Sequence, residues 1–250
     1  MGRRIYYKME KPNSIQCILF DLDNTLWDFD GNAKIALSQL YQQHNLEKRT
    51  GKTDLAFIEI YEVTNADYWR RYEKGEVDKE TLRTRRFIDS LNKLGLSEDL
   101  QPKDLWQEYL DICPTIPNLI PNALSTLAHL KKHFKIGLLT NGFEQTQQTK
   151  IKCSGIDQHI DFMLSSESFG IPKPGKEIFD RAIEMTGTSH EECIYIGDNR
   201  ETDVLGGLNA GIKTAWFKLS EGPKVEHPLF LGEYTHLDDF TDYVMGLIKK

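Results

Sequence analysis

Cysteine is scarce in this chain, with four residues in 250, and no two of them form a Cys-x-x-Cys pair. The four are Cys17, Cys113, Cys153 and Cys193. Their wide separation argues against a metal site built from paired thiolates. Cys17 and Cys193 fall inside predicted strands, so we interpret them as small buried hydrophobic residues and not as metal ligands.

Long apolar runs are also missing. Residues 1–8 contain two arginines but no apolar stretch long enough for a signal region, and no run elsewhere approaches the length of a membrane span. We therefore expect no targeting segment, no membrane partner and cytoplasmic residence.

Net positive charge is lacking as well. The chain has 31 Lys and Arg against 38 Asp and Glu, which gives a net charge of -7. A protein that binds nucleic acid normally presents a basic surface, so this balance argues against a nucleic-acid partner. The remaining composition, 39% hydrophobic and 28% charged, is ordinary for a globular protein of one large or two smaller domains.

What the chain does contain is a short apolar run, residues 18–20, that ends in two carboxylates one residue apart, Asp21 and Asp23. An α/β sheet keeps its ligand sites where buried strands open into loops. A carboxylate pair in that position is costly unless a cation or hydrogen bonds compensate it, and a divalent metal is the cheapest compensation. The alternative is a turn-forming pair of Asp side chains.

Three further β-compatible runs end in polar residues, and they cover residues 136–142, 161–166 and 193–198. Thr140 supplies a hydroxyl next to a glycine-containing turn, a combination that suits a phosphoryl oxygen. Lys173 supplies a cation in a loop stiffened by prolines on both sides. Taken alone, Thr140 could be an ordinary strand end, and Lys173 by itself is better interpreted as a solvated loop cation.

Two more carboxylates, Asp198 and Asp203, lie near a predicted helix start. Oxygen-only ligands favour Mg²⁺ over zinc, which prefers histidine or cysteine. For Asp203 the alternative is a helix N-terminal carboxylate favoured by the helix dipole.

The order of elements indicates an α/β fold. Helical patterns without a convincing strand cover residues 32–44, 54–73, 78–94 and 102–111. After Pro114 and Pro117 strands alternate with helices near 121–133, 144–152, 174–186 and 202–209, followed by a strand at 213–217 and a helix at 237–248. This alternation predicts a parallel sheet covered by helices on both faces. We expect a discontinuous core domain, residues 1–28 and 112–250, and a separate helical domain, residues 29–111.

The ordered set Asp21-x-Asp23-x-Thr25, Thr140, Lys173 and Gly197-Asp198 with Asp203 resembles the four motifs of the haloacid dehalogenase (HAD) superfamily of phosphohydrolases. Residues 139–143 and 206–211 resemble its bacterial 5'-nucleotidase and sugar-phosphate phosphatase branch. One departure is Asn199-Arg200, where many relatives carry Ser or Thr and then a small or apolar residue.

The resemblance implies a Rossmann-like, doubly wound sheet of strand order 5-4-1-2-3, with an all-helical cap inserted after the first strand. That order would place Asp21 beside Asp198. It further implies a phosphatase in which Asp21 is the nucleophile that forms an aspartyl-phosphate, while Asp23 protonates the leaving alcohol and later activates water.

The remaining site residues follow from the same resemblance. Mg²⁺ would be held by the carboxylates of Asp21 and Asp198 and by the Asp23 backbone carbonyl. Thr140, the Asn141 backbone and Lys173 would hold phosphoryl oxygens, and Asp203 would orient water or Lys173.

Substrate choice is expected to lie in the cap. Asn65, Trp69 and Tyr72 share one helical face, and Arg86 and Phe87 follow on the next predicted helix. Arginine and aromatic side chains could stack on a base or clamp a sugar phosphate. Asn65 and Arg86 resemble the nucleotidase cap pattern, whereas for the aromatics packing between the cap helices is the preferred interpretation.

We therefore expect a small soluble phosphomonoester as substrate, with nucleoside 5'-monophosphates first and sugar or sugar-acid phosphates as the alternative. The other candidates are a phosphohexose mutase, a 2-haloacid dehalogenase, in which the second aspartate would be replaced, and a non-catalytic binding module. We expect a monomer or a weak homodimer.

Overall fold

The computed structural model describes residues 14–218 and 221–248. Residues 1–8, whose sequence predicts no targeting segment, lie outside this range. The chain divides into two compact units. The first comprises the described residues within 1–27, 119–144 and 155–250, and the second comprises 28–118 and 145–154.

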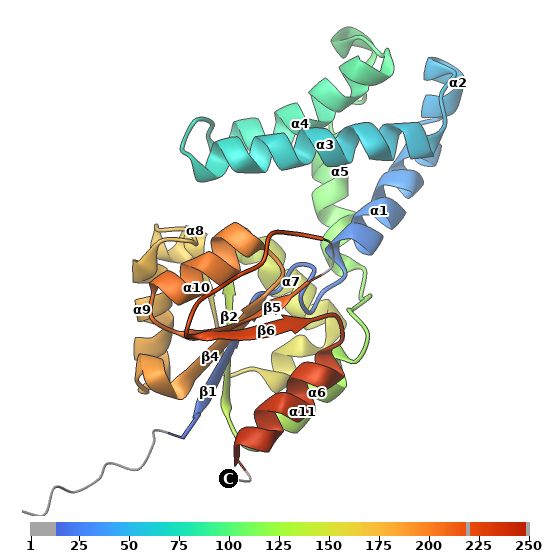
Figure 1. The fold of residues 1–250 in the computed structure, drawn as a ribbon. Helices are drawn as coiled ribbons and strands as arrows, with labels where there is room; N and C mark the ends of the chain where they lie inside the picture. The colour runs from blue at the N-terminus through green and yellow to red at the C-terminus, as the bar shows by residue number, and fades with distance from the viewer. Residues whose placement is uncertain (1–13, 219–220, 249–250) are drawn as a thin grey trace, which may run out of the picture. The chain divides into compact units, whose positions relative to one another are not determined.

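A parallel sheet is the centre of the first unit (Figure 1). Within the described residues it has six strands in the order β3-β2-β1-β4-β5-β6. The strands are β1 (Cys17–Phe20), β2 (Lys135–Thr140), β3 (Phe162–Ser165), β4 (Cys193–Gly197), β5 (Lys213–Phe217) and β6 (Phe230–Tyr234). The α/β class is confirmed, and the first five strands follow the expected order. The sixth is a correction, since β6 was not predicted and pairs with β5 at the edge of the sheet.

Helices cover both faces of this sheet. Figure 1 shows α8, α9 and α10 on one side and α6 and α11 on the other. Their bounds are α6 (Ala123–Leu130), α8 (Ser166–Phe169), α9 (Lys176–Thr186), α10 (Gly206–Asn209) and α11 (Leu237–Ile248), with 3-10 turns at Ile156–His159 and His190–Glu192. The helix expected over 202–209 is instead a π-helix, Arg200–Leu205, that continues into α10.

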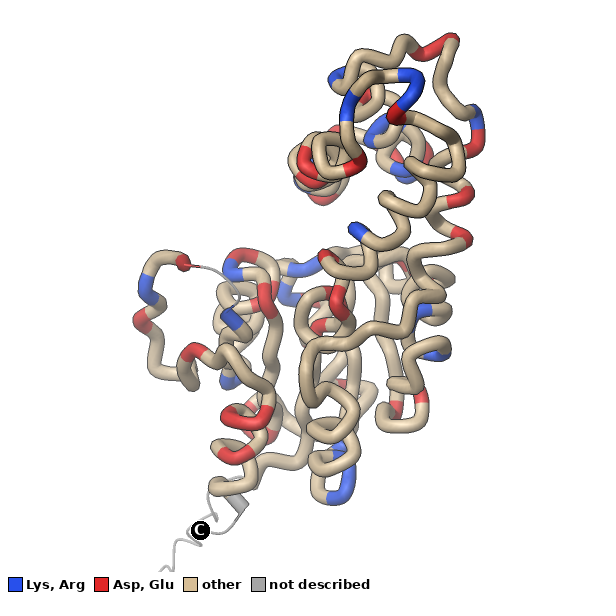
Figure 2. The backbone as a smooth tube through the Cα atoms, turned by 90° about the vertical axis from the view of Figure 1, so that its right-hand side faces the viewer, with Lys and Arg blue, Asp and Glu red and all other residues tan. Residues whose placement is uncertain are grey.

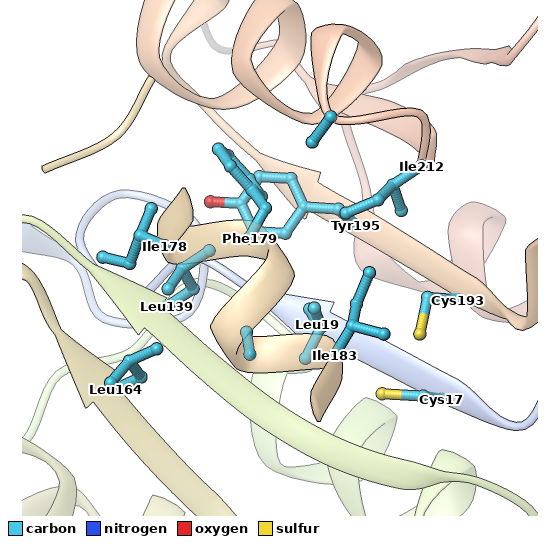
Figure 3. Close-up of a cluster of buried hydrophobic side chains, with 12 residues drawn as sticks. Cys17, Leu19, Leu139, Leu164, Ile178, Phe179, Ile183, Cys193, Tyr195 and Ile212 are labelled. Carbon is cyan, nitrogen blue, oxygen red and sulfur yellow. The ribbon is translucent and has the colours of Figure 1, made fainter. Parts of the chain in front are cut away.

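The core of the first unit forms where α9 packs on the central strands. All four residues of β1 and all five of β4 are buried, which explains why these strands are apolar on both faces. Figure 3 shows Phe179 of α9 next to Tyr195 of β4, and their rings meet edge to face at 5.2 Å between centroids. Cys17 and Cys193, opposite each other in the parallel register, are fully buried, as expected.

The second unit is helical in its described residues. It contains α1 (Phe29–Gln43), α2 (Leu46–Thr50), α3 (Asp54–Glu73), α4 (Lys79–Leu94), α5 (Leu105–Ile112) and most of α7 (Glu144–Ser154), with 3-10 turns at Glu98–Leu100 and Cys113–Thr115. The bounds of α3 agree with the sequence pattern. Helix α1 begins earlier than expected because the Asp28 side chain accepts a hydrogen bond from the Gly31 N–H at 3.0 Å. The short α2 was not predicted.

Acidic and basic positions are interspersed along the backbone (Figure 2). Among the described residues, no helix combines the length and the hydrophobicity needed to cross a bilayer.

Candidate active site

Asp21 lies where β1 ends, at the carboxyl edge of the sheet. Its backbone N–H donates to the Ile196 carbonyl at 2.9 Å, which extends the β1–β4 ladder by one residue. The residue is 6% exposed. Its Oδ1 accepts from Lys173 Nζ at 2.6 Å, and its Oδ2 accepts from Thr25 Oγ1 at 3.3 Å. The carboxylate is therefore held from both sides.

Lys173 is the cation of the site and is 2% exposed. Its ammonium group donates to Asp21 Oδ1 and Asp203 Oδ1, each at 2.6 Å, and to the Tyr195 hydroxyl at 3.0 Å. An ammonium group has three N–H donors, so these three acceptors match its capacity. The Asn141 side chain positions the backbone of this loop, because it donates to Lys173 O at 3.0 Å and accepts from Lys173 N at 2.8 Å.

Asp203 comes from the π-helix that follows β4. Asn199 starts this helix, with its Oδ1 accepting from the N–H groups of Glu201 and Thr202, and its own N–H donates to Asp203 Oδ2 at 3.0 Å. The carboxylate packs against Gly197, where any Cβ would overlap it. Asn199, where the sequence departs from many relatives, therefore caps this helix. The π-helix brings Asp203 within hydrogen-bonding distance of Lys173.

Asp198 completes the acidic group. One carboxylate oxygen from each of Asp21, Asp198 and Asp203 lies within 4.8 Å of the others. The Asp198 backbone is fixed by Trp216, whose Nε1 donates to the Asp198 carbonyl at 2.8 Å. Asp21 and Asp198 thus lie side by side, as the strand order predicts. Among the described residues the Asp23 side chain is outside this group of three, and the metal contact expected of it, through the backbone carbonyl, stays a prediction.

The electrostatics of this group favour a bound cation. Burial raises the pKa of Asp21 to about 7, with Asp203 and Asp23 adding to the shift and Lys173 opposing it. Burial and the neighbouring Asp21 raise the pKa of Asp198 well above its usual value. Burial alone would lower the pKa of Lys173, but Asp203 and Asp21 outweigh it and raise it. Three clustered carboxylates beside one lysine form an oxygen donor set that fits a hard divalent cation such as Mg²⁺.

Thr140 ends β2 at the same edge of the sheet. It is buried, and its Oγ1 accepts from the Gly142 N–H at 3.0 Å, which closes the turn after the strand. Its role toward a phosphoryl group, and that of the Asn141 backbone, stay predictions.

The cap candidates lie in the second unit, on α3 and α4. Arg86 and Asn65 are buried, and Arg86 Nη1 donates to Asn65 Oδ1 at 2.7 Å. The Arg86 guanidinium lies over the rings of Tyr61, Phe87 and Tyr109, at 5.8, 5.1 and 5.5 Å from their centroids. Trp69 is partly exposed and meets Tyr72 edge to face at 5.9 Å. A role in substrate choice stays a prediction for Asn65, Trp69 and Arg86.

Two residues of the site were not anticipated from the sequence. Tyr195 and Trp216 occupy apolar stretches that indicate buried strands. Nothing in those stretches signals that the Tyr195 hydroxyl donates to the Asp203 carboxylate or that the Trp216 indole N–H donates to the Asp198 backbone carbonyl. The hydrogen-bond partner of each polar ring atom can be identified only when the positions of the neighbouring strands are known.

Comparison with known proteins agrees with this geometry. The sequence profile of haloacid dehalogenase-like hydrolases matches residues 15–211. The chain is 30% identical to the pyrimidine 5'-nucleotidase YjjG of Escherichia coli over 200 residues, covering 80% of this chain and 84% of that protein. It is 29% identical to the pyrimidine 5'-nucleotidase PynA of Streptococcus pneumoniae, covering 80% and 82%.

A solved structure is similar over nearly the whole chain. The Bacillus subtilis protein YfnB, in a crystal form bound to magnesium, superposes with a TM-score of 0.79 at 27% identity, covering 92% of this chain and 99% of that one. The profile match spans more than half of the chain, and it includes every motif residue from Asp21 to Asp203. The chain therefore belongs to the haloacid dehalogenase-like hydrolase family.

Proposed function

We propose that this enzyme is a Mg²⁺-dependent phosphatase that hydrolyses small phosphomonoesters, with nucleoside 5'-monophosphates as the preferred class. The observation that carries the proposal is the meeting of Asp21, Asp198 and Asp203 around Lys173 at the carboxyl edge of the sheet. We place it in the cytoplasm, in keeping with the sequence.

Asp21 is the nucleophile of the proposed reaction. One of its carboxylate oxygens forms a bond to phosphorus while the bond from phosphorus to the ester oxygen breaks, which leaves an aspartyl-phosphate on the chain. A phosphate dianion and a carboxylate repel each other, so the step requires positive charge. Lys173 supplies one such charge at 2.6 Å from Asp21 Oδ1. Mg²⁺, when bound, would be held by Asp21, Asp198 and the Asp23 carbonyl. It would supply further positive charge that neutralises the phosphoryl oxygens.

Asp23 is the proposed general acid and base. It follows the nucleophile by two residues in the loop after β1, and it is less buried than Asp21. In its protonated form it gives its proton to the departing alkoxide oxygen. The resulting carboxylate then takes a proton from water, whose oxygen attacks phosphorus and releases Asp21 and inorganic phosphate. General acid and base catalysis of this kind contributes about a hundredfold to ten-thousandfold in rate.

The substrate class is inferred from relatives. Two similar proteins, YjjG and PynA, are pyrimidine 5'-nucleotidases, and both are matched over most of their length. The aspartate at position 23 supports a phosphatase over a dehalogenase. We propose that the cap side chains Trp69, Asn65 and Arg86 recognise the alcohol group that is esterified to phosphate.

A phosphate-release screen tests the proposal. Wild-type enzyme is incubated with nucleoside 5'-monophosphates, sugar phosphates and an aryl phosphate, with Mg²⁺ and with EDTA, next to Asp21→Asn. We expect Mg²⁺-dependent release from nucleoside 5'-monophosphates and none from the variant. Release that persists in EDTA or in the variant would contradict the mechanism, and release from sugar phosphates alone would contradict the substrate class.

A further inference from the structure

The geometry points to Tyr195 as a positioning residue of this reaction: its hydroxyl fixes the Lys173 ammonium group between Asp21 and Asp203. The inference rests on the proposed function. It concerns a side chain that lies in the middle of a buried strand and touches no reacting atom.

The hydroxyl of Tyr195 is part of a closed set of hydrogen bonds. It donates to Asp203 Oδ1 at 2.7 Å and accepts from Lys173 Nζ at 3.0 Å. Lys173 Nζ also donates to the same Asp203 oxygen at 2.6 Å. The three groups form a triangle, and the third N–H of Lys173 is directed at Asp21 Oδ1. Two of the three donors of the ammonium group are thus held so that the third meets the nucleophile.

The fold makes this position rigid. Tyr195 is fully buried in β4, and its ring packs edge to face on Phe179 of α9. Figure 3 shows the ring within an otherwise apolar cluster, with the hydroxyl oxygen at its end. A buried aromatic ring on a central strand loses little freedom when it forms a hydrogen bond, so it places a hydroxyl more precisely than a flexible side chain would.

The alternative is that Tyr195 only fills the core. In that case phenylalanine would serve equally, because it keeps the ring and its contact with Phe179. The hydroxyl argues against this, since a polar group in a buried strand is costly unless it is used, and here it is used twice, toward a lysine and a carboxylate. Removing it would leave one N–H of Lys173 without its acceptor and Asp203 Oδ1 without one of its donors.

The test is Tyr195→Phe, compared with two controls. Tyr41→Phe removes another buried tyrosine hydroxyl, one that bonds Thr50 and the Lys52 carbonyl in the second unit. Phe179→Leu disturbs the packing of the Tyr195 ring but keeps its hydroxyl. For each protein, kcat and KM with a nucleoside 5'-monophosphate and the thermal unfolding midpoint are measured, and kcat is expressed per folded molecule.

We expect Tyr195→Phe to lower kcat about tenfold to hundredfold, the loss that corresponds to a hydrogen bond to a charged group, with KM changed less than about twofold. Tyr41→Phe should keep the wild-type kcat even where it unfolds at a lower temperature. Phe179→Leu keeps the Tyr195 hydroxyl but loosens its ring, so it should lower kcat by less than Tyr195→Phe does. A wild-type kcat in Tyr195→Phe, a loss confined to KM, or an equal kcat loss in Phe179→Leu would overturn the inference. An inactive wild-type enzyme would contradict the proposed function instead.

Discussion

Asn141 and Lys173, 32 residues apart, are joined by two hydrogen bonds between the Asn141 amide side chain and the Lys173 backbone. One runs from Asn141 Nδ2 to Lys173 O at 3.0 Å and the other from Lys173 N to Asn141 Oδ1 at 2.8 Å. The loop after β2 therefore sets the position of the loop that carries Lys173.

Replacing Asn141 should make the position of the Lys173 side chain less well defined. Asn141→Ala removes both hydrogen bonds, so we expect kcat to fall about tenfold or more, since misplacing a catalytic group by about 1 Å costs up to a hundredfold. Asn141→Asp can still accept from Lys173 N but cannot donate to Lys173 O. Its kcat in steady-state assays should lie between those of the wild type and Asn141→Ala. Equal activity in all three proteins would contradict this role.

Lys173 should matter for stability as well as for activity. Lys173→Met leaves Asp21 and Asp203 buried without their cation, and breaking a buried ion pair in this way costs about 3–5 kcal/mol of unfolding free energy. Urea denaturation in the absence of divalent metal measures this loss. The matched control is Lys176→Met, which removes an exposed lysine paired with Asp180 and should cost less than about 1 kcal/mol. Similar losses in the two variants would argue against a buried ionic centre.

Gly197 should tolerate no side chain. A Cβ at this position would overlap the Asp203 carboxylate, so Gly197→Ala must displace Asp203 from Lys173. We expect at least a tenfold loss of kcat. Gly246→Ala in α11 is the control, because no atom lies within 4 Å of the Cβ that it adds and alanine favours helix. Kinetic assays of both variants decide the point, and an active Gly197→Ala enzyme would mean that Asp203 needs no exact placement.

Metal binding should be visible without turnover. Mg²⁺ binding to the folded state alone would raise the unfolding midpoint of the wild-type protein, and EDTA should reverse the shift. Asp198→Asn removes one of the three clustered carboxylates, those of Asp21, Asp198 and Asp203. We therefore expect the Mg²⁺-dependent shift of the unfolding midpoint to shrink or vanish in a thermal melt of this variant. An unchanged shift in this variant would place the ion elsewhere.

The cap offers a separate test of substrate choice. Asn65→Ala leaves the buried Arg86 without its hydrogen-bond acceptor and should lower the unfolding free energy by about 1–3 kcal/mol. If the cap recognises substrate, kcat/KM for nucleoside 5'-monophosphates falls in this variant, in Arg86→Ala and in Trp69→Ala, while hydrolysis of a small aryl phosphate is largely kept. Equal losses on every substrate would show that these residues only hold the cap together.

The sequence pattern was most informative where local signals are strong. Helix α3 begins after Thr53, whose side chain caps it, and its observed bounds agree with the pattern. Strands β1 and β4 are apolar runs that end in aspartates, so their neighbourhood in the sheet follows from the α/β pattern and the family resemblance. Strand β6 was missed because an edge strand with Gly232 at positive φ has no clear apolar alternation.

Side-chain contacts between distant segments could not be predicted from the sequence. Motif spacing singles out Asp21, Lys173 and Asp203, but it gives no sign that Asn141 uses its side chain to hold Lys173 or that Tyr195 joins the same hydrogen-bond set. These pairings depend on which strands are neighbours and on the π-helix after β4, which sequence patterns describe as an ordinary helix. Tertiary geometry therefore assigned the partners of residues that the sequence had identified.

The central claim is that Asp21 carries the phosphoryl group during the reaction. Its most direct test is an acid-quenched single turnover with Mg²⁺ and a reactive nucleoside 5'-monophosphate, followed by peptide mass spectrometry. The account predicts a phosphorylated peptide containing residue 21, modified at Asp21, that forms before phosphate release and is absent in Asp21→Asn. Phosphate released without any such peptide, or a phosphoryl group found on another residue, would contradict it.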